Sequence, residues 1–387
     1  MKAAPRHVLP VLVLAQFAGT SLWFAVNAVM PDLQHELGWP ASAVGRLTSA
    51  IQLGFIAGTL VFALLAIADR FSPRRVFLLC SVAGALSTVG AWWMVREFAA
   101  LWLWRAATGF FLAGIYPVGM KIASQWFPKG LGAALGWLIG ALVLGTASAH
   151  GLRGLMGELP WTSVMLGVAA LAAGGGAMLF ALLPEVPVGP ARSSTFEWRA
   201  LAAMWTDWRV RASVFGYFGH MWELYTLWVI VPLLLSSRLT GMPLSLAAFV
   251  VVGSGALGCV GGGWLARRWG SARVAAGQLA ISGGCCALAP WLIDASVGWF
   301  AVWLLVWGIT VAGDSPQFSA LTASNAPSQA VGSVLTLTNS IGFAISIVSV
   351  ELFTKLAQHH PLGTLLPWLG LGPLLGLLAM WPLLRVR

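Results

Sequence analysis

Runs of roughly 20 mostly apolar residues recur along the whole of this 387-residue chain, and a helix of that length crosses the hydrocarbon core of a bilayer. The runs are continuous and do not alternate apolar with polar residues, so they predict helices and not barrel strands. Hydrophobic residues make up 59% of the chain and charged residues 9%, which leaves too little polar surface for a water-soluble protein. The sequence therefore predicts an all-α integral membrane protein and excludes a soluble enzyme.

Twelve such spans are expected. The Gly-rich run at 131–149 gives the weakest pattern among them. The first run is longer than the apolar part of a signal peptide, so we expect a retained helix there. The spans lie near residues 9–30, 42–66, 76–95, 99–123, 131–149, 161–183, 212–236, 244–266, 274–292, 297–320, 329–353 and 362–384.

Lysine and arginine lie mostly on one side of these spans. Of the 22 basic residues, fifteen fall in the terminal segments or in loops on the side of the termini. Cytoplasmic loops carry such an excess, so both termini are predicted to be cytoplasmic. This bias explains the net charge of +10 better than nucleic-acid binding does. The compact loops suggest a bacterial inner membrane. Four basic residues lie in the opposite loops (Arg96, Arg153, Arg238 and Lys355) and three within spans (Arg46, Arg105 and Lys121).

The longest gap between spans predicts a boundary between two halves. It contains Pro184, Pro187 and Pro190, and proline stiffens a linker and breaks helices. We therefore expect an N-terminal six-helix bundle at 1–183, a cytoplasmic linker at 184–211 and a C-terminal six-helix bundle at 212–387. Residues 195–207 mix aromatic and charged side chains, a pattern that suits a short helix on the membrane surface.

The two halves repeat weakly. The segment 68–76 matches 266–274, the segment 114–117 matches 313–316, and Gly19 matches Gly219, at offsets of 198, 199 and 200. Repeats at half the chain length predict two similarly oriented bundles related by an axis along the membrane normal.

Two motifs resemble signatures of the major facilitator superfamily. The loop after the second span reads Asp69-Arg70-Phe71-Ser72-Pro73-Arg74-Arg75, which is similar to the charged part of the family's loop signature. Leu65 stands where the family usually has its first glycine, and the loop has one extra residue. The fourth span shows the family's Arg-x-x-x-Gly as Arg105 to Gly109. The resemblance covers nearly the full length and implies a secondary transporter that alternates between inward and outward openings.

The charged loop can act as a gate. Asp69 can accept hydrogen bonds from nearby arginines or from a helix N-terminus, and such a cluster can latch helices in one state. The alternative is that the arginines only anchor the loop to anionic headgroups. The expected gating residues are Asp69, Arg70, Arg74 and Arg75, with Arg267 and Arg268 at the repeated position.

Acidic residues inside spans are expensive and suggest proton coupling. Glu223 lies near the middle of the seventh span, and His220 precedes it by three residues on the same helix face. A buried carboxyl beside a histidine can load and release a proton. Asp314 lies between Gly313 and Pro316, which predict local unwinding that frees carbonyl groups. The alternatives are a static pair for Glu223 and His220, and a proline kink with Asp314 paired to Lys121 or Arg105.

Polar stripes on several spans predict a substrate cavity. In the first span the stripe is spaced by four, three and four residues, and at the repeat offset it coincides with His220 and Glu223. Interhelical hydrogen bonding is the alternative reading of these polar residues. Lys121 points away from Arg105 and is expected to reach toward the cytoplasm. The expected cavity residues are Gln16, Thr20, Trp23, Asn27, Arg105, Tyr116, Thr310, Gln317 and Asn339.

These features together predict a secondary transporter that moves a small organic solute by proton symport. The alternative is a proton-coupled efflux antiporter for drugs or lipophilic cations, although the fifth span lacks the proline that the resemblance would imply for drug efflux. A receptor that binds without moving solute is a further alternative.

No nucleophile–base or metal constellation and no phosphate-binding loop occurs, so we expect neither enzyme activity nor a cofactor. The four cysteines lie in apolar runs and predict neither a metal site nor disulfides. The expected partners are the solute, protons and the bilayer, and the chain is expected to be a monomer that binds no nucleic acid.

Overall fold

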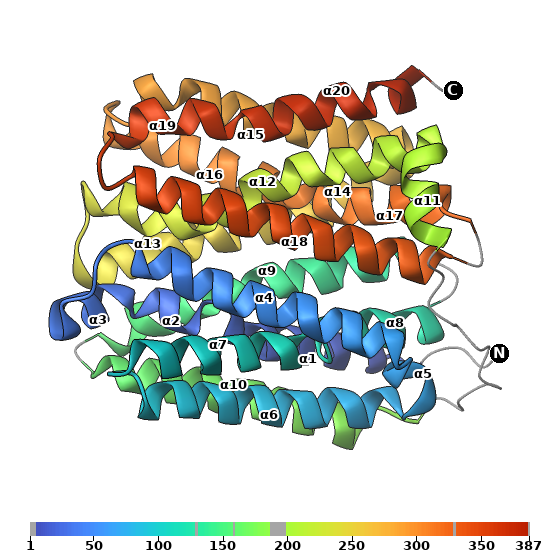
Figure 1. The fold of residues 1–387 in the computed structure, drawn as a ribbon, viewed down its shortest axis with the longest axis horizontal. Helices are drawn as coiled ribbons and strands as arrows, with labels where there is room; N and C mark the ends of the chain where they lie inside the picture. The colour runs from blue at the N-terminus through green and yellow to red at the C-terminus, as the bar shows by residue number, and fades with distance from the viewer. Residues whose placement is uncertain (1–4, 128–130, 158, 186–198, 328–329, 386–387) are drawn as a thin grey trace.

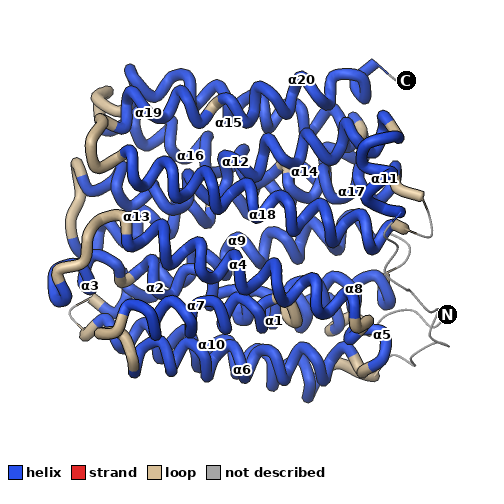
Figure 2. The backbone as a smooth tube through the Cα atoms, viewed as in Figure 1, coloured by secondary structure: helices blue, strands red, loops and turns tan. Residues whose placement is uncertain are grey.

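The computed structural model describes residues 5–127, 131–157, 159–185, 199–327 and 330–385. All regular elements among these residues are helices (Figure 2). Twelve helices or interrupted helices are long and apolar enough to cross a membrane, which confirms the predicted number. They span Val8–Leu37, Ala43–Leu64, Pro73–Trp93, Phe98–Trp126, Gly132–Met156, Trp161–Leu182, Trp208–Ser236, Gly241–Trp269, Ser271–Leu292, Val297–Asn325, Val331–Leu356 and Leu362–Arg385.

The first six spans and the loop after the second contain ten helices and one 3₁₀ segment. The first span is divided into α1, η1, α2 and α3, and the fourth into α7 and α8, while the short α5 follows the second span. The bounds are α1 Val8–Thr20, η1 Ser21–Phe24, α2 Ala25–Ala28, α3 Met30–Leu37, α4 Ala43–Leu64, α5 Ile67–Arg70, α6 Pro73–Trp93, α7 Phe98–Leu112, α8 Tyr116–Trp126, α9 Leu131–Met156 and α10 Trp161–Leu182.

The last six spans follow the short helix α11. The eighth span is divided into α13 and α14, the tenth into α16 and α17, and the twelfth into α19 and α20. The bounds are α11 Arg199–Thr206, α12 Trp208–Ser236, α13 Gly241–Gly253, α14 Gly255–Trp269, α15 Ser271–Leu292, α16 Val297–Gly313, α17 Ser315–Asn325, α18 Val331–Leu356, α19 Leu362–Leu369 and α20 Leu371–Arg385.

The segment expected to join the halves is partly helical. Helix α11 forms inside the stretch 195–207 that the pattern of side chains predicted to be helical. The Asp207 carboxylate accepts hydrogen bonds from the backbone of Arg209 and Val210, which caps the start of α12. The seventh helix therefore begins four residues before the predicted 212. Residues 186–198 of the expected linker lie outside the described residues.

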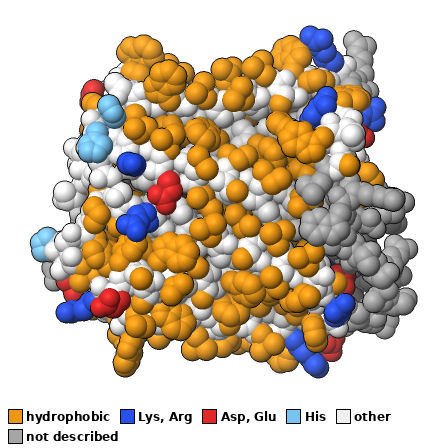
Figure 3. All heavy atoms as spheres, in the orientation of Figure 1, with side chains coloured by type: hydrophobic (Ala, Val, Ile, Leu, Met, Phe, Trp, Pro, Cys, Tyr) orange, Lys and Arg blue, Asp and Glu red, His pale blue; other side chains and the backbone are white. Residues whose placement is uncertain are grey.

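The helices run side by side, and α1 begins at the same end of the bundle at which α20 ends (Figure 1). We call this end the terminal face and the other end the opposite face. The halves meet mainly where α9 packs against α13 and α14 and where α4 packs against α18. The middle of the bundle exposes large apolar side chains, such as Leu86 at 63% and Leu257 at 69%, while charged side chains lie mainly toward its ends (Figure 3). Such a belt of exposed apolar surface is the pattern of a membrane protein.

The repeated motif at 114–117 and 313–316 falls at equivalent interruptions. The fourth span is interrupted between α7 and α8, and the tenth between α16 and α17. The predicted unwinding at Asp314 is slight, because this residue keeps right-handed helical angles (φ −77°, ψ −22°). Its carbonyl accepts hydrogen bonds from the backbone of Gln317 and Phe318. The Ala312 carbonyl, which Pro316 cannot bond, accepts instead from Cys259 Sγ at 3.3 Å, so one carbonyl is released from the helix here as expected, but it is bonded to a neighbouring helix.

Candidate functional site

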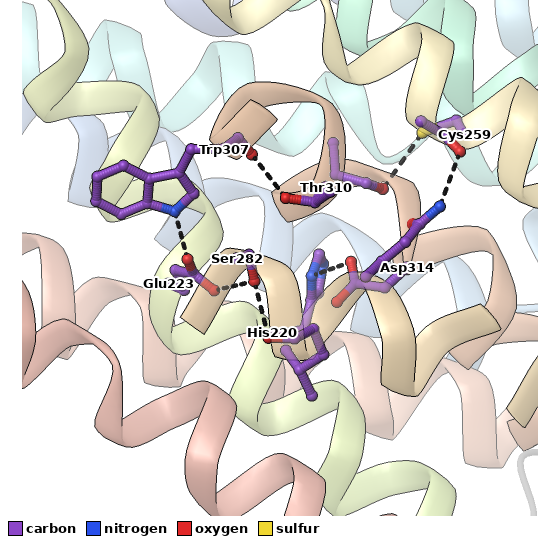
Figure 4. Close-up of polar contacts among 11 residues, drawn as sticks. His220, Glu223, Cys259, Ser282, Trp307, Thr310 and Asp314 are labelled. Atoms are coloured by element: carbon purple, nitrogen blue, oxygen red, sulfur yellow. Dashed lines mark hydrogen bonds and ion pairs between the residues drawn. The ribbon is translucent and has the colours of Figure 1, made fainter. Parts of the chain in front are cut away.

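His220 and Asp314 form a buried pair inside the C-terminal half. His220 Nδ1 lies 2.7 Å from Asp314 Oδ1, and the two side chains are 1% and 0% exposed (Figure 4). His220 belongs to α12, and Asp314 lies at the junction of α16 and α17. The pair therefore connects the seventh and tenth spans. Asp314 does not pair with Lys121 or Arg105, because both of these reach backbone groups of the N-terminal half.

Glu223 contacts different helices from His220. Its carboxylate is fully buried and accepts hydrogen bonds from Trp307 Nε1 at 2.5 Å, Ser282 Oγ at 2.9 Å and Cys286 Sγ at 3.3 Å (Figure 4). The static pair of Glu223 with His220, which was the alternative to proton coupling, is not formed, because His220 contacts Asp314 instead. Three residues along a helix leave side chains about 60° apart, which is enough for each to meet a different neighbouring helix. Glu223 ties α12 to α15 and α16.

A small cavity of about 30 Å³ lies between the two halves. Two of the predicted cavity residues, Tyr116 and Asn339, line it. Sequence reasoning missed Tyr217 and Tyr225, which line it from α12. The signal was present, since Tyr217 precedes His220 by three residues and tyrosine is rare in this chain. Ser315, next to Asp314, also lines the cavity, so the His220–Asp314 pair adjoins its wall.

The polar stripe of the first span divides among several surroundings. Gln16 and Thr20 are fully buried and line neither the central cavity nor the pocket on either face. Thr20 donates to the carbonyls of Gln16 and Leu142, so it bonds α1 to itself and to α9. Asn27 donates to Thr48 Oγ1 at 2.8 Å and lines a larger pocket on the opposite face. The stripe therefore lies in the interior, as predicted, and of its residues Asn27 lines the pocket on the opposite face.

Trp23 lies in a group of rings at the boundary of the halves, which we call the aromatic cluster. Trp23 stacks on Phe343 at a centroid distance of 5.6 Å and an interplanar angle of 2°. The cluster consists of Trp23, Phe55, Tyr225, Trp228 and Phe343.

Arg105 supports the interruption in the first span. Its guanidinium donates to the carbonyls of Leu22 at 3.1 Å and Trp23 at 2.6 Å, both within η1. Arg105 is 1% exposed and lines neither the central cavity nor the pocket on either face, so its place in a substrate cavity stays a prediction. A 3₁₀ segment inside a longer helix leaves carbonyls without their usual partners, and a buried guanidinium can satisfy two of them.

Thr310 and Gln317 likewise line neither the central cavity nor the pocket on either face. They are 7% and 3% exposed, and Thr310 donates to the carbonyl of Val306 within its own helix. Sequence spacing placed them on the face of Asp314, but that face packs against other helices.

Each end of the bundle contains a pocket. The opposite-face pocket has a volume of about 320 Å³ and includes Asn27, His150 and Trp228 in its lining. The terminal-face pocket has a volume of about 290 Å³, and Lys121 of α8 and Thr336 of α18 are among the residues that line it. Trp228 lines both the opposite-face pocket and the central cavity, and therefore separates them.

The predicted gating loop lies on the terminal face. Asp69 accepts a hydrogen bond from Lys121, which also donates to the carbonyl of Ala68. Lys121 thus reaches the terminal end, as predicted, but it bonds to the loop there. Arg70, Arg75, Arg267 and Arg268 are exposed, and the Arg268 guanidinium lies over the Trp264 ring.

Arg74 connects the gating loop to the end of α10. It donates to the carbonyl of Leu183 at 3.0 Å and to the Glu185 carboxylate at 3.3 Å. Hydrogen bonding from Ser72 and the positive charge of Arg74 lower the pKa of Glu185 below its usual range. The Glu185 carboxylate therefore stays charged to a lower pH than an isolated glutamate would. Its contact with Arg74 stabilises the fold over the same pH range, and this stabilisation is lost as the pH falls through the lowered pKa.

Comparison with known proteins agrees with this arrangement. The profile of the Major Facilitator Superfamily matches residues 12–350. The uncharacterized transporter YgaY of Escherichia coli O157:H7 is 28% identical over 194 residues, or 47% of this chain and 47% of that protein. The chloramphenicol resistance protein of Streptomyces lividans is 30% identical over 194 residues, or 49% of this chain and 47% of that protein. The match thus spans about half the length of these curated relatives. The crystal structure of the nucleoside transporter NupG, as a D323A mutant, has the same fold, with a TM-score of 0.74, 15% identity and coverage of 98% of this chain and 100% of that one.

Proposed function

Because the chain belongs to the Major Facilitator Superfamily, we propose that it is a secondary active transporter that moves a small organic solute with a proton by alternating access. The observation that carries the proposal is the buried His220–Asp314 pair next to a cavity that both halves line. A titratable pair in that position can link proton binding to solute binding.

The arrangement of pockets supports alternating access. A pocket opens on each face, and the centre between them is nearly closed at about 30 Å³. One wall of the central cavity comes from α8 and α9 and the other from α12 and α18. A rocking movement of the halves would therefore enlarge the cavity and connect it to one pocket at a time.

Coupling follows from the electrostatics of the pair. A protonated His220 and a charged Asp314 compensate each other in a site that excludes water. Loss of the proton would leave the carboxylate without a counter-charge, and an uncompensated buried charge is strongly unfavourable. The surrounding helices would then shift to a state that hydrates or pairs Asp314. Proton release and movement of α12 against α17 would be linked.

Glu223 is the second carboxyl in the proposed proton path. It is fully buried and accepts three hydrogen bonds, none of them from a basic side chain. A change in its protonation would alter the contacts that hold α12 to α15 and α16. We therefore include Glu223 with His220 and Asp314 among the proton-coupling residues.

The orientation belongs to the same proposal. The excess of Lys and Arg on the terminal side supports an orientation with the terminal face toward the cytoplasm. The bacterial origin of the matching transporters supports a bacterial inner membrane.

The first experiment is transport by the purified protein in proteoliposomes that contain a pH-sensitive dye. A panel of metabolites and drugs is added one compound at a time, with protein-free liposomes as the control. Acidification of the lumen during solute entry is expected for symport. Solute entry with no change in pH would contradict proton coupling.

Variants then locate the coupling site. Asp314→Asn and Glu223→Gln should each abolish uphill transport and largely retain counterflow, because exchange of bound solute needs no net proton movement. Glu351→Gln serves as the matched control, since this carboxyl lies near the opposite end of α18 and outside the network. If Glu223→Gln transports uphill like the parent protein, Glu223 has only a structural role. If Asp314→Asn does so, the coupling assignment is wrong.

Proton-coupled efflux is the second candidate. The relative from Streptomyces lividans is described as a chloramphenicol resistance protein, which favours the export of a drug-like solute. The same dye assay separates the two functions, because solute entry through an antiporter would make the lumen more alkaline.

A further inference from the structure

The central cavity gathers a rare residue type. The chain contains only three tyrosines, and all of them line this cavity. Tyr116 comes from α8 of the N-terminal half, while Tyr217 and Tyr225 come from α12. Asn339 of α18 lies on the same wall and is partly exposed. The cavity therefore offers phenol rings and neutral hydrogen-bonding groups from both halves.

The aromatic cluster lies between this cavity and the opposite-face pocket. Tyr225 lies 5.2 Å from Phe343, 5.2 Å from Trp228 and 5.8 Å from Trp23, measured between ring centroids. Since Trp228 also lines the opposite-face pocket, a solute moving between pocket and cavity must pass these rings.

Two hydrogen-bond donors of the cluster have no acceptor. Trp23 and Trp228 are each 1% exposed, and no acceptor among the described residues bonds to their indole Nε1 atoms. A buried donor without a partner is unfavourable, so a ligand that brought an acceptor would be favoured. The two unpartnered N–H groups suit a ligand that carries a carbonyl, nitro or ether oxygen.

The route carries no formal counter-charge. No Asp, Glu, Lys or Arg of the described chain lines the opposite-face pocket or the central cavity. The nearby charges are already engaged: Arg105 by carbonyls, Asp314 by His220 and Glu223 by three donors. An ionic solute would lose its hydration here without gaining a partner.

We infer that the solute is an uncharged molecule with a planar aromatic ring and a hydrogen-bond acceptor, bound among the aromatic cluster and the three tyrosines. This inference names the solute class and rests on the transport function proposed above. The aromatic ring of the solute stacks on the cluster when the halves separate. The acceptor of the solute takes a hydrogen bond from the indole N–H of Trp23 or Trp228. Tyr116, Tyr217 and Asn339 bond its remaining polar groups.

Four small probes test this class by binding, which requires neither flux nor coupling. They are benzamide, benzoate, benzyltrimethylammonium and cyclohexanecarboxamide, which vary charge and aromaticity at similar size. Binding to the full-length protein in nanodiscs is measured by ligand-observed NMR titration. Benzamide should bind at least tenfold more tightly than each of the others. Tighter or equal binding of benzoate, of the quaternary cation or of the saturated amide would overturn the inference, as would no binding of benzamide to folded protein.

Trp228→Phe tests the donor itself, because it keeps a ring and removes the N–H. We expect benzamide affinity to fall about fivefold, the loss typical of one hydrogen bond, with little change in thermal unfolding. Trp299→Phe is the matched control, since Trp299 is 67% exposed on the outside of the bundle. Equal benzamide affinity in Trp228→Phe and the parent would contradict the role of this donor.

The two proposals fail separately. Selective benzamide binding without a pH change during transport would contradict the proposed coupling and leave the solute class standing. Proton-coupled transport of an ion or of an aliphatic solute would refute the solute class and leave the transport function standing.

Discussion

Arg105 illustrates how a charged residue in a membrane span can serve the backbone. A lone arginine in an apolar span suggests substrate binding, because its burial is expensive. In the structure its guanidinium instead holds two carbonyls of η1, at the interruption of the first span. Trp23 supplies one of these two carbonyls, and its ring stacks in the aromatic cluster. Arg105 therefore also positions the ring that faces the C-terminal half.

Arg105→Lys should therefore destabilise the protein while keeping the charge. A lysine ammonium cannot bridge two carbonyls in the geometry of the guanidinium fork, so a loss of about 1–3 kcal/mol in the free energy of unfolding is expected. Thermal unfolding in detergent measures this. Arg273→Lys is the control, since Arg273 is exposed at the start of α15. Equal unfolding midpoints for the two variants would show that the bonds to η1 contribute little.

Equivalent helices of the two halves approach through glycine. A Cβ atom on Gly109 of α7 would lie 1.9 Å from the carbonyl oxygen of Ile51 in α4. A Cβ atom on Gly258 of α14 would lie 1.9 Å from the carbonyl oxygen of Ile309 in α16. The second and fourth spans thus pack like the eighth and tenth, and in both pairs backbone meets backbone.

Gly109→Ala should force α7 away from α4. Because the clash is with backbone and not with a flexible side chain, we expect a loss of at least about 1–3 kcal/mol in the free energy of unfolding. Gly277→Ala is the matched control: a Cβ atom there would have no described neighbour within 4 Å, so alanine should be neutral or slightly stabilising in helix α15. The midpoint of thermal unfolding should fall for Gly109→Ala and stay the same or rise slightly for Gly277→Ala. An unchanged midpoint for Gly109→Ala would refute the close packing of α7 against α4.

The whole molecule is nearly closed at its centre and has a pocket at each end. On the terminal face, the contact of Lys121 with Asp69 ties the loop containing α5 to α8 beside a pocket that α18 also lines. This contact acts within the N-terminal half, at the place where that half meets the C-terminal one. Its loss would loosen one wall of the terminal-face pocket.

Lys121→Gln should therefore make the terminal-face pocket more accessible. Thr336→Cys, which lines the pocket from α18, reports this through its rate of reaction with a water-soluble thiol reagent. The four native cysteines are buried, so background labelling is low. We expect a severalfold faster reaction when Lys121→Gln is added. Asp294→Asn, a change beyond the end of α15, should leave the rate unchanged. Equal rates in all three proteins would argue against a latch.

The sequence by itself determined the twelve spans, because about 20 apolar residues are stable in a bilayer only as a helix. It also determined the repeat, the interior position of the first-span stripe and the presence of Glu223, His220 and Asp314. Sequence motifs identified the family because they occur at fixed positions along this topology.

Only the tertiary structure decided which side chains meet. Spacing along α12 placed His220 and Glu223 on one face, yet each contacts a different neighbouring helix. The partner of Arg105 is backbone, and the pattern of side chains does not reveal a 3₁₀ segment. The gathering of all three tyrosines around one cavity depends on how α8 and α12 approach from opposite halves. Helix contacts of this kind are set by packing between residues far apart in sequence, and local periodicity carries no information about them.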